Sequence, residues 1–211
     1  MFVAAVIISL VLVNPYLRLD IDDSRLDMSG NLHYRLLLAH IFTAAVAIVL
    51  GPLQFMSAVR ARRRLHRTIG RAYLLAGVLP SAVTAIPVAL WSGRIVTQVG
   101  LVIAAVLWLI TGGLAHRAAR RRDFTGHRDW MMRNYALTFL AVTSRLLTPL
   151  LLLAQLPFVG DGAGPVAERV QSVIPVGQTL GWIVNLMVAE SLIGRRLRRG
   201  AAAVPLNSRG G

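Results

Sequence analysis

Long apolar runs alternate with short polar segments along the whole chain, and most of these runs have the length of a helix that crosses a bilayer. The hydrocarbon core of a bilayer, about 30 Å thick, needs about 20 apolar residues in a helix. The runs occupy residues 2–17, 36–56, 72–91, 98–115, 134–156 and 175–194. The pattern therefore predicts an all-α, polytopic transmembrane bundle of about six helices, with residues 1–199 as one domain and residues 200–211 as a low-complexity cytoplasmic tail.

Composition supports the assignment to the membrane. Of the 211 residues, 55% are hydrophobic and only 15% are charged, whereas about a quarter of the residues in a soluble domain are charged. All 23 basic residues are arginine and the formal net charge is +14, which in a soluble domain would be typical of a nucleic-acid-binding protein. Here the arginines lie in short clusters between apolar runs, which is the pattern of membrane loops. Nucleic acid is therefore not an expected partner.

The distribution of arginine predicts the orientation of the chain in the membrane. Segments 57–71 and 117–133 each hold six arginines and segment 195–199 holds four, whereas the loops on the other side hold five in all. Positive residues mark the cytoplasmic ends of membrane helices. Both arginine-rich loops and both ends of the chain are therefore predicted to face the cytoplasm. The arginines also predict contacts with anionic lipid headgroups, worth about 1 kcal/mol each, while the sequence identifies no protein partner.

The two arginine-rich loops share an order of residues. Residues 57–73 read SAVRARRRLHRTIGRAY, and residues 116–135 read HRAARRRDFTGHRDWMMRNY. Each loop has an arginine cluster, then a His-Arg pair, and then an arginine and a tyrosine that open an apolar run. Such twin segments predict two related helix hairpins of the same orientation, which is a parallel internal repeat. Convergence of two basic hairpins is an equally good explanation.

The order of motifs resembles a known family. A histidine early in a helix followed by GPLQF, then RRRLHRTIGRAY, then HRDWMMRNYALT and an arginine in the next helix, is similar to the bacterial predicted membrane proteins grouped as domain-of-unknown-function family 2306. The likeness covers most of the chain from His40 to Arg145. It implies a multi-pass protein of the bacterial plasma membrane, and it implies no established activity.

Polar residues at membrane depth are expensive to hold there, so they are the first candidates for function. In the second run, His40 begins a stripe at helical spacing that continues through Ala44, Ala47, Gly51 and Gln54. Small residues are common where bilayer helices pack closely, which is one interpretation of the stripe. The other interpretation is a slot for a flat ligand, such as a porphyrin or a quinone, with His40 at its outer end.

A second candidate site is built from histidines on the cytoplasmic side. His116 follows Gly112 and Gly113 at the end of the fourth run, and glycines there leave room for an axial ligand to reach a haem iron. His66 and His127, each just before a helix on the same side, are the candidate partners. These residues predict a haem b or a quinone as the cofactor. Alternatively, all three histidines are interfacial residues among arginines and lipid headgroups.

Arg145 is placed close to the middle of the bilayer, because it follows Asn134 by about 16–18 Å of helical rise. An unpaired guanidinium group at that depth costs at least a few kcal/mol, so a partner is expected. Glu190, the acidic residue inside the sixth run, is one candidate, but it lies close enough in sequence to Arg195 and Arg196 to pair with them instead. Backbone carbonyls and amide side chains are one class of partner for Arg145, and an anionic ligand is the other.

Several chemistries are excluded by the sequence. Cysteine is absent, which excludes disulfides and thiolate sites, and no phosphate loop, HExxH motif or nucleophile elbow is present. Five histidines with few carboxylates predict no metal site. Asp129 and Arg133, four residues apart, are expected to pair on a helix surface.

Three functions therefore stay open. One is the binding of a small anionic or planar ligand, or of a lipid, within the bundle. The second is redox chemistry with b-type haem or quinone, and the third is a non-catalytic subunit or sensor that docks a cytoplasmic partner. The candidate ligand-binding residues are His40, His66, His116, His127 and Arg145.

Overall fold

The computed structural model describes residues 2–17, 30–155 and 166–202, so most of the predicted tail lies outside the described residues. All regular structure in these ranges is helical, as predicted. The elements are α1 (Phe2–Val13), the 3-10 turn η1 (Asn14–Tyr16), α2 (Asn31–Leu53), α3 (Ser57–Ala61), α4 (Arg63–Ala72), the π-helix η2 (Tyr73–Val78), α5 (Leu79–Leu90), α6 (Ile95–Arg120), α7 (Phe124–Thr138), α8 (Leu140–Gln155) and α9 (Val166–Ala202).

Four stretches of the described chain are long and apolar enough to span a membrane, and they are α2, residues 63–90, α6 and residues 168–199. Helices α7 and α8 together make a fifth candidate span, and residues 5–16 form a shorter apolar helix. The run expected as one helix over residues 134–156 is thus divided, with a bend of 48° between α7 and α8. Near the bend, Thr138 Oγ1 lies 3.1 Å from the carbonyl oxygen of Asn134, and contacts of a threonine side chain with the preceding turn are common where helices bend.

The third span contains the π-helix η2, which ends two residues before Pro80. Proline has no N–H group to donate to the carbonyl four residues earlier, and its ring crowds that carbonyl. Just before Pro80, the N–H of Leu79 donates to the carbonyl oxygen of Leu74, five residues back, so the wider π turn absorbs the disruption. The span therefore continues past the proline without a break in the helix.

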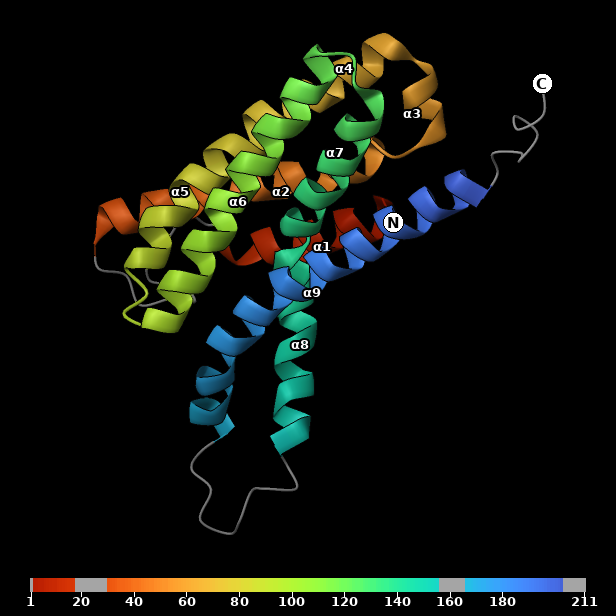
Figure 1. The fold of residues 1–211 in the computed structure, drawn as a ribbon. Coiled ribbons are helices and arrows are strands. Elements are labelled where there is room, and N and C mark those ends of the chain that lie inside the picture. The colour runs from red at the N-terminus through yellow and green to blue at the C-terminus, as the bar shows by residue number, and fades with distance from the viewer. Residues whose placement is uncertain (1, 18–29, 156–165, 203–211) are drawn as a thin grey trace, which may run out of the picture.

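The helices pack in a sequential order. Helix α2 packs against α1, η2 and α5, then α5 packs against α6, and α6 against α7. Figure 1 shows α7 running on into α8, which leaves the main group of helices together with the first half of α9. The long helix α9 crosses at the junction of α7 and α8 and also contacts α6. This crossing brings the last turns of α9 to the same end of the molecule as the start of α7.

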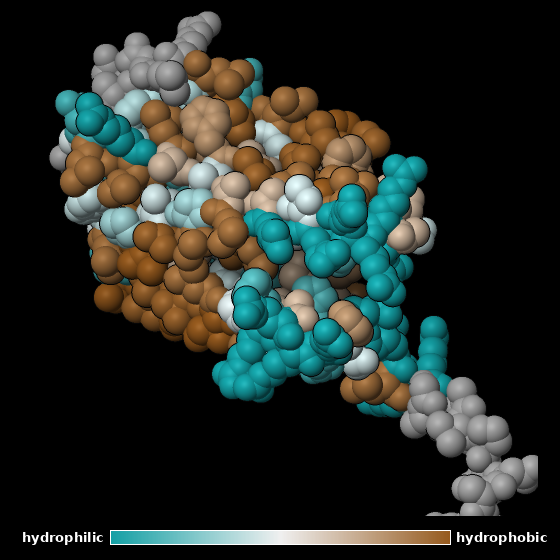
Figure 2. All heavy atoms as spheres, turned by 90° about the horizontal axis from the view of Figure 1, so that it is seen from above, coloured by the Kyte–Doolittle hydropathy of each residue, from teal (hydrophilic) through white to brown (hydrophobic). Residues whose placement is uncertain are grey.

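The largest buried cluster lies where η2, α6 and α7 meet, and it includes Tyr73, Trp108, Met131 and Tyr135. Many large apolar side chains instead point outward along the candidate spans, such as Leu75 on η2, which is expected of a surface that contacts lipid. Figure 2 looks down on the end that carries α3 and α4, where hydrophilic side chains gather on one side of the face and hydrophobic ones cover most of the rest. The exposed arginines of α3, α4 and the α6–α7 connection account for this polar end.

Candidate functional site

His40 links α2 to α5. Its Nδ1 atom lies 2.9 Å from the carbonyl oxygen of Ser81 and 3.0 Å from Ser81 Oγ. The Ser81 hydroxyl in turn donates to the carbonyl oxygen of His40 at 3.2 Å, and Ser81 is fully buried. The Nδ1 hydrogen of His40 therefore satisfies the Ser81 carbonyl. This reciprocal contact is the kind of interhelical hydrogen bond that stabilises packed bilayer helices.

The remainder of the His40 stripe is covered by other helices. A Cβ atom at Gly51 would lie 2.1 Å from Cε2 of Tyr135, so the Tyr135 ring fills that position. One turn earlier, Ala47 lies so close to η2 that a Cβ atom at Gly77 would be 3.0 Å from its backbone. These contacts agree with the close-packing interpretation. A flat ligand in the stripe would have to displace the Tyr135 ring.

The structure brings together the histidines of the twin arginine-rich loops. The ring centroids of His66 on α4 and His127 on α7 are 6.4 Å apart, and the ring planes are almost perpendicular at 85°. His127 Nδ1 lies 2.8 Å from the carbonyl oxygen of Ala115, so Nδ1 carries a hydrogen and donates it to that carbonyl. His116, the residue after Ala115, is exposed on α6. The pair is thus His66 with His127, and His116 stands outside it.

Two buried polar atoms beside this pair have no hydrogen-bond partner. One is Nδ1 of His66, and the other is Nε2 of Gln54, whose side chain is only 6% exposed. Gln54 lies against Gly70, because a Cβ atom there would be 3.1 Å from Gln54 Oε1. Gly70 is one helical turn after His66 and shares its face of α4. A buried polar group without a partner costs about 1–3 kcal/mol, so both atoms indicate that a ligand or water belongs at this place.

A buried hydrogen-bond network lies deeper in the bundle. Tyr73 Oη donates to Asn134 Oδ1 at 2.6 Å and contacts Thr138 Oγ1 at 2.8 Å. Trp108 Nε1 donates to Thr138 Oγ1 at 2.9 Å. Asn134 Nδ2 donates to the carbonyl oxygen of Trp108 at 2.8 Å and to Thr111 Oγ1 at 2.9 Å. The network therefore joins η2, α6 and α7.

One assignment of hydrogens satisfies the short contacts of the network together. Trp108 Nε1–H donates to Thr138, the Thr138 hydroxyl donates to Tyr73, and the Tyr73 hydroxyl donates to Asn134 Oδ1. The Asn134 amide then returns to the carbonyl of Trp108. Each of these four residues therefore donates a hydrogen bond to the next. Successive hydrogen bonds of this kind polarise and strengthen one another in a low-dielectric interior.

The hydrogen-bond network and the histidine pair lie along the same two packed helix segments. Tyr73 follows His66 by seven residues, and Asn134 follows His127 by seven. Seven residues make about two helical turns, so each pair of residues shares one face of its helix. The segments that meet at His66 and His127 therefore meet again two turns deeper, at Tyr73 and Asn134. The buried network holds these segments together two turns away from the histidine pair.

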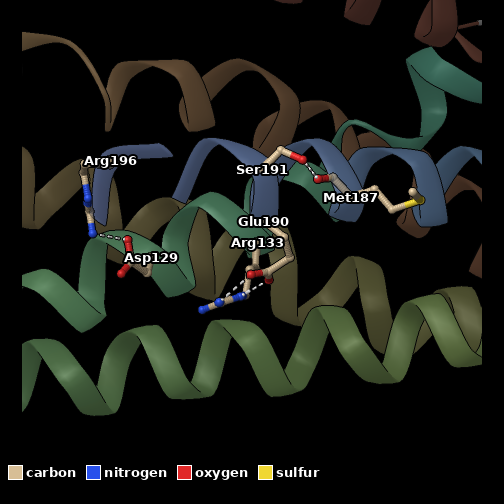
Figure 3. Close-up of polar contacts among 6 residues, drawn as sticks. All are labelled: Asp129, Arg133, Met187, Glu190, Ser191 and Arg196. Carbon is tan, nitrogen blue, oxygen red and sulfur yellow. Dashed lines mark hydrogen bonds and ion pairs between the residues drawn. The ribbon is translucent and has the colours of Figure 1, made fainter. Parts of the chain in front are cut away.

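Two ion pairs fasten α9 to α7, and Figure 3 shows both. Arg133 donates to Glu190 through Nε at 2.5 Å and through Nη2 at 2.9 Å, and its guanidinium group lies 4.6 Å from the Trp130 ring centroid. Arg196 Nη2 donates to Asp129 Oδ1 at 2.6 Å. The expected partners were different, since Asp129 was matched with Arg133 and Glu190 with the arginines after it. Because α9 crosses α7, each carboxylate meets an arginine of the other helix, and Glu190 gains a two-bond contact.

Replacing Glu190 with glutamine is expected to lower the free energy of unfolding by about 0.5–1 kcal/mol, because Glu190 is half exposed and such pairs are weakened by solvent. The loss should shrink at high ionic strength. The measurement is equilibrium unfolding in mixed micelles at two salt concentrations. Arg195→Gln, an exposed change on α9 away from its first and last turns, is the control and should have a smaller effect. Equal losses in both variants would show that the contact with Arg133 contributes nothing.

Arg145 lies on α8 beyond the bend and is exposed. Its Nη1 atom donates to the carbonyl oxygen of Ala141 at 2.7 Å, one turn earlier on the same helix. Asn185, one of the amides expected to meet it, is bonded to Thr143 Oγ1 and to the carbonyl oxygen of Ala136 instead. A backbone carbonyl is thus among the partners of Arg145. The structure does not place it at the histidine pair, which lies at the start of α7.

Most of the residues described above lie within a segment that matches a known protein family. A family model described as "Predicted membrane protein (DUF2306)" matches residues 37–193, which include the histidine pair, the buried network and Glu190. Searches of curated proteins and of solved structures gave no match. The family match covers well over half of the chain and agrees with the helical, apolar structure. The chain therefore belongs to the DUF2306 family of predicted membrane proteins.

Proposed function

We propose that this protein is a redox protein of the bacterial plasma membrane that holds one b-type haem between His66 and His127. An imidazole nitrogen lies about 1.1 Å from its ring centroid, and a metal–nitrogen bond is about 2.0 Å long, so two imidazoles on opposite sides of one ion have centroids about 6.2 Å apart. The observed separation is 6.4 Å, in a T-shaped arrangement of the two rings, so at least one ring would have to turn for both imidazole nitrogens to point at one ion. This separation is the observation that carries the proposal.

The surroundings of His127 support its role as a ligand. Metal-ligating histidines almost always donate their second ring N–H to a carbonyl or carboxylate, which fixes the tautomer and the direction of the ring. The contact between His127 Nδ1 and the carbonyl oxygen of Ala115 has this form. It leaves Nε2 as the free donor atom for iron.

The number of ligands favours haem over a bare metal ion. Among the described residues, no cluster of three or more histidine, aspartate or glutamate side chains is present, and a structural or catalytic ion such as zinc needs at least three protein ligands. Haem iron needs only axial ligands from the protein, because the porphyrin supplies four nitrogens. Arg60 is close enough to His66 for their charges to interact, and arginines there would pair with haem propionates.

A bound haem would carry one electron at a time, and the residues of this chain would hold it and tune it. His66 and His127 would hold the iron, and the Ala115 carbonyl, which lies 2.8 Å from His127 Nδ1, would orient one of the two rings. The buried network at Tyr73 and Asn134 keeps α4 and α7 at the spacing that the two ligands need. The partly buried position limits the access of water, which is one of the factors that set a haem potential. In this proposal six spans place both chain ends, and the haem, on the cytoplasmic side.

The test is the absorption spectrum of the full chain, expressed in haem-replete cells and purified in mild detergent. We expect a Soret band, an α-band that sharpens on reduction, and about one haem per chain, because the site offers one pair of axial ligands. Circular dichroism reports whether the protein is folded. A folded but colourless protein after haem supplementation would overturn the proposal.

Quinone is the second candidate, and the atoms without partners favour it. Gln54 Nε2 is a buried donor and His66 Nδ1 is a buried donor or acceptor, and the carbonyl oxygens of a quinone would accept from such groups. Organic extraction of the colourless protein, followed by chromatography, distinguishes the two ligands. Recovery of stoichiometric quinone without haem would establish the second candidate in place of the first.

A further inference from the structure

We propose that the groove between the start of α7 and the end of α9 binds the headgroup of one anionic phospholipid. The groove has a volume of about 530 Å³ and is lined by Phe124, Thr125, Arg128, Arg196 and Leu197. It lies at the polar end of the molecule, among the arginine-rich segments. The site is separate from the histidine pair, and nothing in it depends on a bound haem.

The positive charges that line the groove favour the binding of an anion. Arg128 and Arg196 both line it, and the Nη2 atom of Arg196 is bonded to Asp129 at 2.6 Å. That bond fixes the direction of the Arg196 side chain, and a guanidinium group has five N–H donors, so others stay available to a ligand. Two guanidinium groups beside one carboxylate leave a net positive charge. Arginine is also the side chain best suited to phosphate, which it can bind through two parallel hydrogen bonds.

The first turn of α7 already carries a side-chain cap, and the two arginines supply the charge that attracts an anion. Asp123 caps α7, and its Oδ1 atom accepts from the N–H of Gly126 at 2.8 Å. A ligand in the groove would therefore meet side-chain donors, with Thr125 as a further hydroxyl donor at its edge.

The apolar walls favour a phospholipid over a soluble anion. Phe124 is 71% exposed and Leu197 is 55% exposed, and both line the same groove as the arginines. An aromatic ring and an aliphatic side chain beside guanidinium groups are the usual composition of a membrane surface, where apolar groups meet acyl chains and charges meet headgroups. A free phosphate would leave these side chains uncovered. A phospholipid covers the apolar walls and the charges with one molecule.

The test is native mass spectrometry of the full chain in mild detergent, titrated with phosphatidylglycerol or phosphatidylcholine. We expect one phosphatidylglycerol to be retained per chain in preference to phosphatidylcholine. Arg128→Gln should weaken this retention about tenfold, as loss of a hydrogen bond between charged groups does. Arg120→Gln is the matched control, because Arg120 is exposed in the last turn of α6 and outside the groove. It should change retention less than twofold.

A second variant keeps the charge and removes an apolar wall. Leu197→Gln should also weaken the retention of phosphatidylglycerol, because the acyl chain then loses its contact. Equal losses in Arg128→Gln and Arg120→Gln would show a diffuse attraction to arginines and overturn the site. Equal retention of the two lipids would overturn it as well. Displacement of the lipid by millimolar inorganic phosphate, with no effect of Leu197→Gln, would identify a free-phosphate site and overturn the lipid proposal.

Discussion

Substitution of His127 by alanine is expected to abolish the Soret band of the purified protein, and substitution of His66 is expected to do the same. Each change removes one of the two imidazoles whose centroids lie 6.4 Å apart. Loss of a group that merely orients a metal ligand costs about 10- to 100-fold in metal affinity, and loss of the ligand itself should cost at least as much. Haem content per folded chain, measured after purification, checks this expectation.

His116→Ala and His40→Ala are the matched controls. His116 is exposed on α6, and His40 is bonded to Ser81, so both variants should keep their haem. Imidazole added to His127→Ala should restore part of the spectrum, which a purely structural role of His127 would not allow. If His116→Ala lost the haem and His127→Ala kept it, the assignment of the pair would be wrong.

Asn134→Ala is expected to lower the free energy of unfolding by about 2–3 kcal/mol. Asn134 is completely buried and makes three hydrogen bonds through its side chain. Hydrogen bonds between bilayer helices contribute about 0.6 kcal/mol each on average, and the cavity left by the smaller side chain adds to the loss. Equilibrium unfolding in mixed micelles, followed by circular dichroism, measures the change. Asn31→Ala, an exposed substitution at the start of α2, is the control.

A double-mutant cycle tests whether the network acts as a unit. Tyr73→Phe removes only the hydroxyl group that donates to Asn134 Oδ1, and it should cost about 1 kcal/mol alone. In the Asn134→Ala background it should cost clearly less, because part of its partner set is already gone. Strictly additive losses would show that Tyr73 and Asn134 stabilise the protein independently.

The helical class and the apolar runs could be predicted from the sequence because bilayer thickness dictates the length of a span. The division between α7 and α8 could not be predicted from the sequence. The division occurs at Phe139, within a predominantly apolar run that has no proline before Pro149. The bend accompanies a side-chain contact of Thr138 with its own helix, and Thr138 is held in place by Tyr73 and Trp108. Such a cause is tertiary and leaves no mark in a hydropathy pattern.

The candidate histidines were identified from the sequence, but their pairing was not. Gly112 and Gly113 drew attention to His116, because small residues beside a histidine leave room for a flat cofactor. In the structure Gly112 makes room for the network instead, since a Cβ atom there would lie 3.2 Å from Asn134 Nδ2. The sequence feature that indicates the pairing is an equal spacing, from His66 to Tyr73 and from His127 to Asn134. Seven residues separate them in both loops.

The partners of the ion pairs also could not be predicted from sequence spacing alone. Asp129 and Arg133 have the spacing of partners on one helix, and Glu190 has arginines close behind it in sequence. Their actual partners are 67 and 57 residues away, because α9 crosses α7. Local spacing predicts which residues can pair on an isolated helix, and a crossing helix changes the outcome whenever it offers a better geometry.

The ring of hydrogen bonds around Asn134 also bears on how protons move through the protein. The chain that starts at the indole N–H of Trp108 ends at the carbonyl oxygen of the same residue. A relay that conducts protons needs one end that receives a proton and another that releases it, and a closed ring of side chains that stay neutral has neither. On this assignment of hydrogens, the ring of Trp108, Thr138, Tyr73 and Asn134 offers no open path along which a proton could leave the histidine pair.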